Sequence, residues 1–332
     1  MCGLDNGPRA QASPDGFAEL FEHAPFCSPE EWASRRGEFA ADADDMDRSE
    51  LGRGSFGVTY RVRSRAAAAG GWRAGVEDGQ LFAAKLVLKR ELSRQGMGRG
   101  EVEKEVAAQA RLRHAHVIRF FRLFEDRTGF YLVMELAEGG TLASRVCAAL
   151  SASDVWRWTL QLARVLEYIH DQGMAHRDLK PENVLLSRSG DVKVGDFGLA
   201  KDVAGMSARM SMSMTKVGTP NYLSPELGEG IPGSVRANDV WALGCIVLEL
   251  VTHQRLDGPL WSTHAAIVAK RTALLARALA ADPLLGAAAA NMLALKYRRR
   301  CSAAQLFRLL DPKPPPAPLQ VTWRSVVCSS IC

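Results

Sequence analysis

Short runs of apolar and β-branched residues mark candidate strands in the first part of the chain. Residues 58–62 (Val-Thr-Tyr-Arg-Val) alternate between apolar and polar side chains, and residues 81–88 and 130–136 are mostly apolar. Runs of this length and composition are typical of strands. Residues 64–79, which are rich in Ala, Gly and Arg, look like an insertion between two of these strands.

Longer segments show helical patterns. Residues 101–113 predict one helix, and residues 154–171 predict a long amphipathic helix. The apolar residues on one face of the second helix have the spacing of a packed core: Val155, Trp158, Leu162, Val165, Leu166 and Ile169. Residues 238–252 are apolar on all sides, so we expect a buried helix there.

Residues 174–198 carry the densest set of candidate chemical groups. Asp178 could accept a proton from an attacking hydroxyl, while Asn183 and Asp196 offer oxygen ligands to a metal. Two short strands between residues 184 and 194, joined by a turn, would place Asn183 and Asp196 side by side. One base and two oxygen ligands for Mg²⁺ suit phosphoryl transfer, because that reaction depends mostly on positioning and charge neutralisation.

This stretch resembles the catalytic and metal-binding loops of protein kinases. Residues 176–183 match the pattern H-R-D-L-x-x-x-N and residues 196–198 match D-F-G, both without a substitution. The alternative is a buried ion-pair loop of another fold, which the joint occurrence of the two motifs disfavours. The resemblance covers the chain from about Glu50 to Leu310, and residues 217–226 and 239–245 look most like those of NIMA-related kinases.

The resemblance implies an α+β fold with two lobes that bind ATP and Mg²⁺ between them. The small β-rich N-lobe would cover residues 48–136, and the larger α-helical C-lobe would cover residues 137–310. Residues 1–47 would form an N-terminal extension that is partly disordered, and residues 311–332 a Pro-rich tail.

The implied reaction is transfer of the γ-phosphoryl group of Mg-ATP to Ser or Thr hydroxyls of protein substrates. Lys180, two residues after the candidate base Asp178, is typical of serine/threonine kinases and would contact the transferred group. Within the family pattern Asp239 would support the backbone of the catalytic loop, and Arg300 would pair with Glu226. The remaining catalytic residues that the resemblance implies are Lys85, Glu105 and Asn183.

Lys85 stands in the lysine position of the family's V-A-I-K strand, where it would hold the α and β phosphates of ATP. In the family this lysine pairs with a helical glutamate. The helix after residue 100 offers Glu101, Glu103 and Glu105, and counting back from the motif that begins at His114 selects Glu105.

The glycine-rich stretch 51–60 matches G-x-G-x-x-G, a spacing that dinucleotide folds share. A strand follows it rather than a helix, which favours the kinase arrangement. Thr59 replaces the family's usual Val, Met134 takes the gatekeeper position, and Glu135 and Ala137 would bind the adenine edge through backbone groups. The expected ATP-binding residues are Leu51, Gly52, Arg53, Gly54, Ser55, Phe56, Gly57, Thr59, Ala83, Lys85, Met134, Glu135, Ala137, Glu182, Leu185 and Asp196.

Four residues are candidates for regulation. Arg177 precedes the candidate base and needs an anion partner, which a phosphate on Thr215 would supply; Thr219 is a second position in the same loop. Gln109 stands where active kinases carry an apolar residue. A Gln there either leaves an amide short of partners or lets the helix swing out, so we expect weak basal activity and dependence on a partner that pushes the helix inward. An alignment shift of one residue would put Ala108 or Ala110 there instead.

Composition limits the remaining possibilities. The net charge of +5 is mild and the basic residues are scattered, which argues against a nucleic-acid-binding module. The seven cysteines lack C-x-x-C spacing, and no apolar run is long enough to span a bilayer, so we expect a cytoplasmic or nuclear protein. Palmitoylation of Cys328 or Cys332 is conceivable, although a free tail is the favoured interpretation.

Three functions therefore compete: an active serine/threonine kinase, a catalytically weak kinase or pseudokinase that acts as a signalling scaffold, and a basic binding module. The complete set of expected catalytic residues favours the first. Protein substrates are the expected partners, together with an activating kinase or a helix-positioning partner.

Overall fold

The computed structural model describes residues 50–54, 57–63, 80–148, 150–198, 200–202, 212–213, 218–231, 233–256 and 264–310. The expected extension 1–47, the insertion 64–79 and the tail 311–332 lie outside the described residues. The chain divides into two compact units, and one division falls between Leu136 and Ala137. The second unit also takes in Leu112–Ile118.

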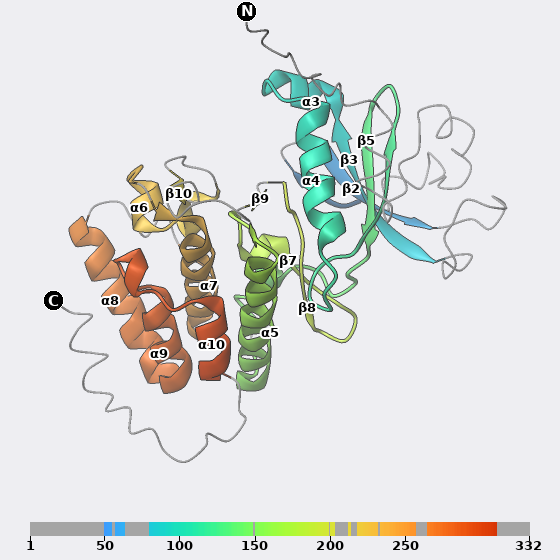
Figure 1. Cartoon of the computed structure of the whole chain (residues 1–332). Helices are drawn as coiled ribbons and strands as arrows, with labels where there is room; N and C mark the ends of the chain where they lie inside the picture. Colours follow the sequence, from blue (N-terminus) through green and yellow to red (C-terminus); the bar gives the residue numbers. More distant parts are fainter. Residues whose placement is uncertain are drawn as a thin grey trace, which may run out of the picture. The chain divides into compact units, whose positions relative to one another are not determined.

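The first unit is built on an antiparallel sheet with the strand order β1-β2-β3-β5-β4 (Figure 1). The sheet confirms the strands predicted from the apolar runs. Two helices, α3 and α4, follow β3 along the chain. The elements are β1 (Glu50–Gly54), β2 (Gly57–Arg63), β3 (Leu81–Leu88), α3 (Lys89–Arg94), α4 (Arg99–Arg111), β4 (Phe120–Glu125) and β5 (Gly129–Glu135).

Helix α4 packs on the sheet through its apolar face. Val102 and Val106 are buried in one cluster with residues of β3, α3, β4 and β5, which are Val87, Leu92, Phe120, Leu123, Phe130 and Leu132. The helix begins and ends two residues earlier than the predicted 101–113. The earlier start is explained by the Glu101 carboxylate, which accepts a hydrogen bond from Gly98 N at 2.9 Å.

The second unit is mainly helical, with three small antiparallel strand pairs, β6-β9, β7-β8 and β10-β11 (Figure 1). Its helices are α5 (Ala152–Asp171), α6 (Pro225–Gly228), α7 (Val235–Thr252), α8 (His264–Ala281), α9 (Pro283–Met292) and α10 (Ala303–Leu310). Its strands are β6 (Met174–Ala175), β7 (Val184–Leu186), β8 (Val192–Val194), β9 (Lys201–Asp202), β10 (Met212–Ser213) and β11 (Gly233–Ser234). No helix among the described residues is long and apolar enough to cross a membrane.

Two of these helices confirm the sequence patterns. Every residue from Asn238 to Val251 in α7 is buried, as expected for a segment that is apolar on all sides. Helix α5 buries all of its predicted apolar face. It begins two residues earlier than predicted because Ser151 caps it, with Oγ accepting a hydrogen bond from Asp154 N at 3.1 Å.

Candidate active site

The hairpin β7-β8 brings Asn183 and Asp196 together, as the sequence predicts. Val184 pairs with Val194, so Asn183 and Asp196 both lie at the open end of the hairpin. Gly195 N donates a hydrogen bond to Asn183 O at 2.9 Å, which extends the pairing by one step. Asp196 is exposed and has a positive φ of 58°, a backbone conformation that is uncommon outside glycine.

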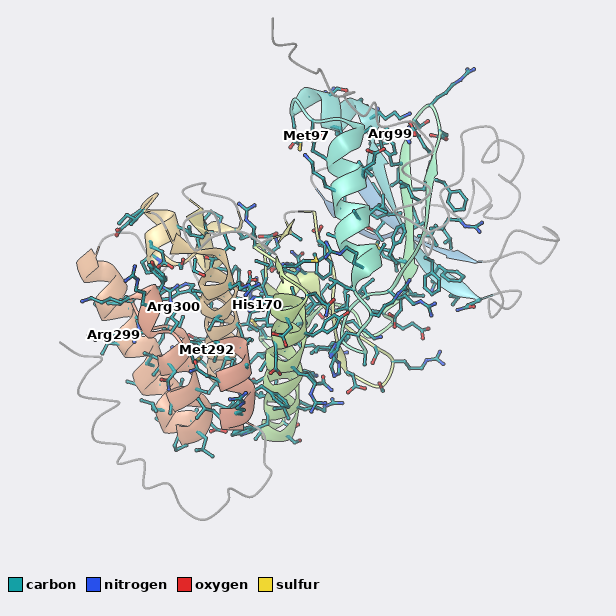
Figure 2. All side chains as sticks on the ribbon, in the orientation of Figure 1. Met97, Arg99, His170, Met292, Arg299 and Arg300 are labelled. Carbon is teal, nitrogen blue, oxygen red and sulfur yellow. The ribbon has the colours of Figure 1, made fainter. Side chains whose placement is uncertain are left out.

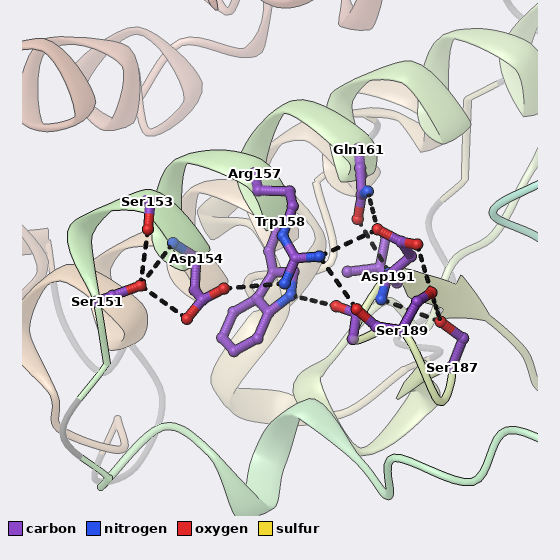
Figure 3. Close-up of polar contacts among 11 residues, drawn as sticks. Ser151, Ser153, Asp154, Arg157, Trp158, Gln161, Ser187, Ser189 and Asp191 are labelled. Atoms are coloured by element: carbon purple, nitrogen blue, oxygen red, sulfur yellow. Dashed lines mark hydrogen bonds and ion pairs between the residues drawn. The ribbon is translucent and has the colours of Figure 1, made fainter.

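The turn of this hairpin is fixed to α5 by side chains of the helix (Figure 3). The Gln161 amide makes two bonds: Oε1 accepts from Val192 N at 3.0 Å, and Nε2 donates to Asp191 Oδ1 at 2.7 Å. Trp158 Nε1 donates to Gly190 O at 2.8 Å. Hydrogen bonds from Ser189 and Gln161 lower the pKa of Asp191, so this carboxylate stays charged.

Asp178 is held by several donors. Oδ1 accepts hydrogen bonds from Thr219 N at 2.9 Å and Thr219 Oγ1 at 2.8 Å. Oδ2 accepts from Lys180 Nζ at 2.8 Å and from Asn183 Nδ2 at 3.1 Å. This network fixes the direction of the carboxylate. Because Asn183 Nδ2 is engaged with Asp178, the opposite amide atom, Oδ1, is the one that can face a cation.

The backbone of the loop is held by Asp239, which is fully buried in α7. Its carboxylate accepts hydrogen bonds from His176 N at 2.9 Å and Arg177 N at 2.8 Å. His170 on α5, labelled in Figure 2, places Nε2 at 3.0 Å from Asp239 Oδ2. The structure therefore shows the support that the sequence assigned to Asp239, and it adds His170.

The first unit contains its own group of expected site residues. Lys85 Nζ donates to Glu105 Oε1 at 2.7 Å, and both side chains are mostly buried. Of the other two glutamates, Glu101 accepts from Gly98 N and Glu103 pairs with Arg99, so Glu105 alone among the three faces Lys85.

The sheet register places further expected residues around Lys85. Thr59 lies opposite Lys85, and Ala83, two residues earlier on the same strand, lies opposite Met134. Opposite residues and residues two apart share one face of a sheet, so these four side chains lie together. A Cβ on Gly57 would lie 1.7 Å from Leu86 O, so this position accepts only glycine.

The remaining expected ATP-binding residues divide between the units. Leu51, Gly52, Arg53 and Gly54 lie on β1, and Glu135 ends β5. Ser55 and Phe56 lie outside the described residues. In the second unit Leu185 forms a β-bridge with Thr141. Thr141 lies four residues after Ala137. The Glu182 side chain pairs with Arg255.

The four regulatory candidates have different outcomes. Thr215 lies outside the described residues. Arg177 is half-buried, and burial lowers the pKa of its guanidinium. The Thr219 hydroxyl contacts both Asp178 and Lys180, so it lies beside the expected catalytic residues. Gln109 is 1% exposed and its Nε2 lies 3.5 Å from Met134 Sδ, so Gln109 takes the inward position, whereas Ala108 and Ala110 are half-buried. The outward swing of the helix that Gln109 suggested is not present, because Glu105 on α4 contacts Lys85 on β3.

Sequence reasoning missed a buried polar cluster beside Glu182. Glu249 is fully buried in α7 and accepts hydrogen bonds from Tyr222 OH at 3.1 Å and Leu256 N at 2.6 Å. Burial raises the pKa of Glu249, and burial together with the Glu249 charge raises that of Tyr222. Arg255 contacts both Glu182 and Glu249. The available signal was a single glutamate within the otherwise apolar run 240–251.

Arg300 and Glu226 form the buried ion pair that the sequence predicts. Arg300 Nη1 and Nη2 donate to the two carboxylate oxygens of Glu226 at 2.6 and 2.7 Å. The Arg300 guanidinium also lies over the Trp241 ring, 4.8 Å from its centroid. This pair ties the segment around α6 to the end of the helical unit.

Comparison with known proteins supplies the family context. A family model described as "Protein kinase domain" matches residues 46–308. Serine/threonine-protein kinase Nek1 of Mus musculus is 33% identical over 207 residues, which cover 61% of this chain and 16% of that protein. CBL-interacting protein kinase 4 of Oryza sativa subsp. japonica is 40% identical over 207 residues, covering 60% and 42%.

Aurora kinase B of Drosophila melanogaster is 33% identical over 239 residues, which cover 70% of this chain and 64% of that protein. The chain thus spans less than two thirds of the length of these three relatives. Kinases named Nek recur among the matches, as the resemblance to NIMA-related kinases predicts.

Proposed function

Because this chain belongs to the protein kinase family, we propose that it transfers the γ-phosphoryl group of ATP to Ser or Thr hydroxyls of protein substrates. The observation that carries the proposal is the arrangement around Asp178, whose carboxylate is held by Lys180, Asn183 and Thr219. A fixed carboxylate beside a lysine suits a reaction in which a hydroxyl loses a proton as it attacks a phosphoryl group.

In this proposal Asp178 Oδ atoms accept the proton of the substrate hydroxyl. Lys180 Nζ, 2.8 Å from Asp178 Oδ2, places a positive charge where the transferred group would pass. Lys85, fixed by Glu105, would hold the α and β phosphates as a compact ammonium charge. Residues 48–310 would form the kinase domain, and the glycine-rich strand pair β1-β2 would cover the nucleotide.

Asn183 and Asp196 are the residues that would hold Mg²⁺. Their amide and carboxylate oxygens are of the type that Mg²⁺ binds. The fit is supported by the Asn183 amide, whose nitrogen is engaged with Asp178 at 2.8 and 3.1 Å, which turns the oxygen to the opposite side. When bound, the ion neutralises phosphate charge.

Arg177 motivates a proposal about regulation. Burial already disfavours its charged form, so a phosphate on Thr215 would give the guanidinium a matching anion and order the surrounding loop. The proposed cellular location is the cytoplasm or nucleus, where ATP and protein substrates occur together.

Phosphorylation of a degenerate peptide library by the purified full chain tests the activity. Phosphoserine and phosphothreonine should form, read by mass spectrometry, and Asp178→Asn should lower the rate by about 100-fold or more while ATP binding persists. Asp171→Asn, at an exposed position that ends α5, is the matched control and should keep the wild-type rate. Predominant phosphotyrosine, or full activity in Asp178→Asn, would contradict the proposal.

A further inference from the structure

The carboxylate of Glu125, the last residue of β4, is almost buried and lies between two cations. Glu125 is 8% exposed. Oε1 lies 2.7 Å from Lys89 Nζ, and Oε2 accepts a hydrogen bond from Arg99 Nη1 at 2.9 Å. Lys89 begins α3 and Arg99, labelled in Figure 2, begins α4, so one carboxylate of the sheet binds the first residue of both helices.

The chain that leads into α4 contains glycines and orients the helix only weakly, so a further restraint on α4 matters. Gly96 has a positive φ of 68°, and a Cβ on Gly96 or Gly98 would meet no atom within 4 Å. Met97, in the connection between α3 and α4, packs against the apolar cluster that contains Val102 and Val106, and α4 begins two residues later. Glycines have no side chain that packs on a neighbour, so these positions restrict the direction of the helix little.

The apolar contacts of α4 do not determine its tilt by themselves. Val102 and Val106 pack on the sheet, but burial of apolar surface is non-directional and tolerates small rotations. Hydrogen bonds between charged groups require short distances and defined angles. The Arg99–Glu125 contact therefore restrains the first turn of α4 in a way that the apolar cluster does not.

The tilt of α4 matters for the Lys85–Glu105 ion pair. Glu105 follows Arg99 by six residues, about 9 Å along a helix that rises 1.5 Å per residue. Lys85 Nζ and Glu105 Oε1 are 2.7 Å apart, and a displacement of about 1 Å would exceed hydrogen-bond distance. A rigid helix transmits a movement of its first turn to Glu105.

We propose that Glu125 is a positioning residue, whose carboxylate holds the start of α4 against the sheet and so keeps Glu105 in contact with Lys85. Glu125 acts through Arg99 and touches neither nucleotide nor substrate. The effect on rate rests on the proposed kinase function, whereas the effect on the Lys85–Glu105 pair does not.

Glu103 provides a matched control on the same arginine. Its Oε1 lies 2.5 Å from Arg99 Nε, but Glu103 and Arg99 both belong to α4, so their pair does not tie the helix to the sheet. Glu125→Gln and Glu103→Gln each remove one carboxylate charge from Arg99. Only the first should change the position of the helix.

The first measurement is the acetylation rate of Lys85 by an N-hydroxysuccinimide ester, followed by mass spectrometry on the full chain without nucleotide. A lysine hydrogen-bonded to a carboxylate reacts slowly, so Glu125→Gln should raise the labelling rate several-fold, while Glu103→Gln should leave it unchanged. Arg99→Gln breaks the same contact at a side chain that is 47% exposed and should reproduce the effect if Glu125→Gln folds poorly.

The second measurement separates positioning from general destabilisation. Glu125→Gln should lower kcat by about tenfold to 100-fold and leave the peptide KM nearly unchanged, because misplacement by about 1 Å has effects of this size. In a Glu105→Gln background, adding Glu125→Gln should cause no further loss, since residues that act through one contact are not additive.

Unchanged Lys85 labelling in both Glu125→Gln and Arg99→Gln would overturn the proposal, as would a further loss of rate in the double variant. If labelling responds as expected but no variant, nor the wild type, transfers phosphate, the positioning role stands and the proposed kinase function fails.

Discussion

Replacing Ser224 by alanine should stabilise the protein, because its hydroxyl is buried without a hydrogen bond. Ser224 is 0% exposed, and among the described residues no partner lies within hydrogen-bond distance of its Oγ. It occupies the N-cap position of α6, yet the side chain makes no cap bond. Its backbone N–H is satisfied by Asn238 Oδ1 at 2.9 Å, so alanine can keep the same backbone contact.

The expected gain follows from the balance of two terms. A buried polar group without a partner costs about 1–3 kcal/mol. Removal of one oxygen leaves a void smaller than a methyl group, which costs less than about 1 kcal/mol. The unfolding free energy should therefore rise by roughly 1 kcal/mol, or about 2–4 °C in Tm for a domain of this size.

Urea unfolding at constant temperature measures this difference, with the midpoint expected to rise and the slope m to stay unchanged. Ser151→Ala is the control, because it removes a hydroxyl that does cap a helix, α5. That variant should lose about 1 kcal/mol. If Ser224→Ala unfolds at or below the wild-type midpoint while Ser151→Ala behaves as expected, the hydroxyl is satisfied in solution and the reasoning is wrong.

Four further predictions concern activity and stability. Gln109→Leu should raise the peptide phosphorylation rate of the unpartnered chain several-fold, because an apolar side chain suits a site that is 1% exposed. This corresponds to a change of about 1 kcal/mol in the free energy that favours the inward position of α4. An unchanged rate with normal folding contradicts the prediction. Thr215→Ala should lower the rate by about tenfold or more, and equal activity of phosphatase-treated and untreated chain would remove the idea. Burial raises the pKa of Glu249 above 4.5, so the native state binds this proton more tightly than the unfolded state and wild-type stability falls as pH rises through the raised pKa. The stability of Glu249→Gln relative to wild type, from urea midpoints at several pH values, should therefore increase with pH. His253→Gly should add about 1 kcal/mol in the same assay, because His253 ends α7 with a φ of 54° that glycine adopts without strain.

The arrangement of the β7-β8 hairpin could be predicted because its determinants are local. Two short apolar strands separated by a five-residue turn leave one pairing that buries Val184, Leu186, Val192 and Val194, and that pairing forms. Helices α5 and α7 could be predicted for the same reason, since their apolar patterns lie within one segment. Their first residues differed because the capping serines precede the apolar pattern.

The polar contacts between distant segments could not be predicted from pattern alone. Glu125 is one of many charged residues in the sequence, and only the fold shows that Lys89 and Arg99 approach it from different helices. The Glu249 cluster is similar, because Arg255 reaches it after the helix has ended at His253. Pairs such as Glu226–Arg300 were predictable only through family resemblance, since 74 positions separate the two residues.

The contacts of Asp239 have a consequence for the dynamics of the loop that contains His176 and Arg177. Surface loops usually exchange their amide hydrogens easily, because small openings expose them to water. The amides of His176 and Arg177 instead donate to the fully buried carboxylate of Asp239, near the start of α7. We therefore expect these two amides to exchange slowly, together with the core of their unit, rather than at the rate of a surface loop.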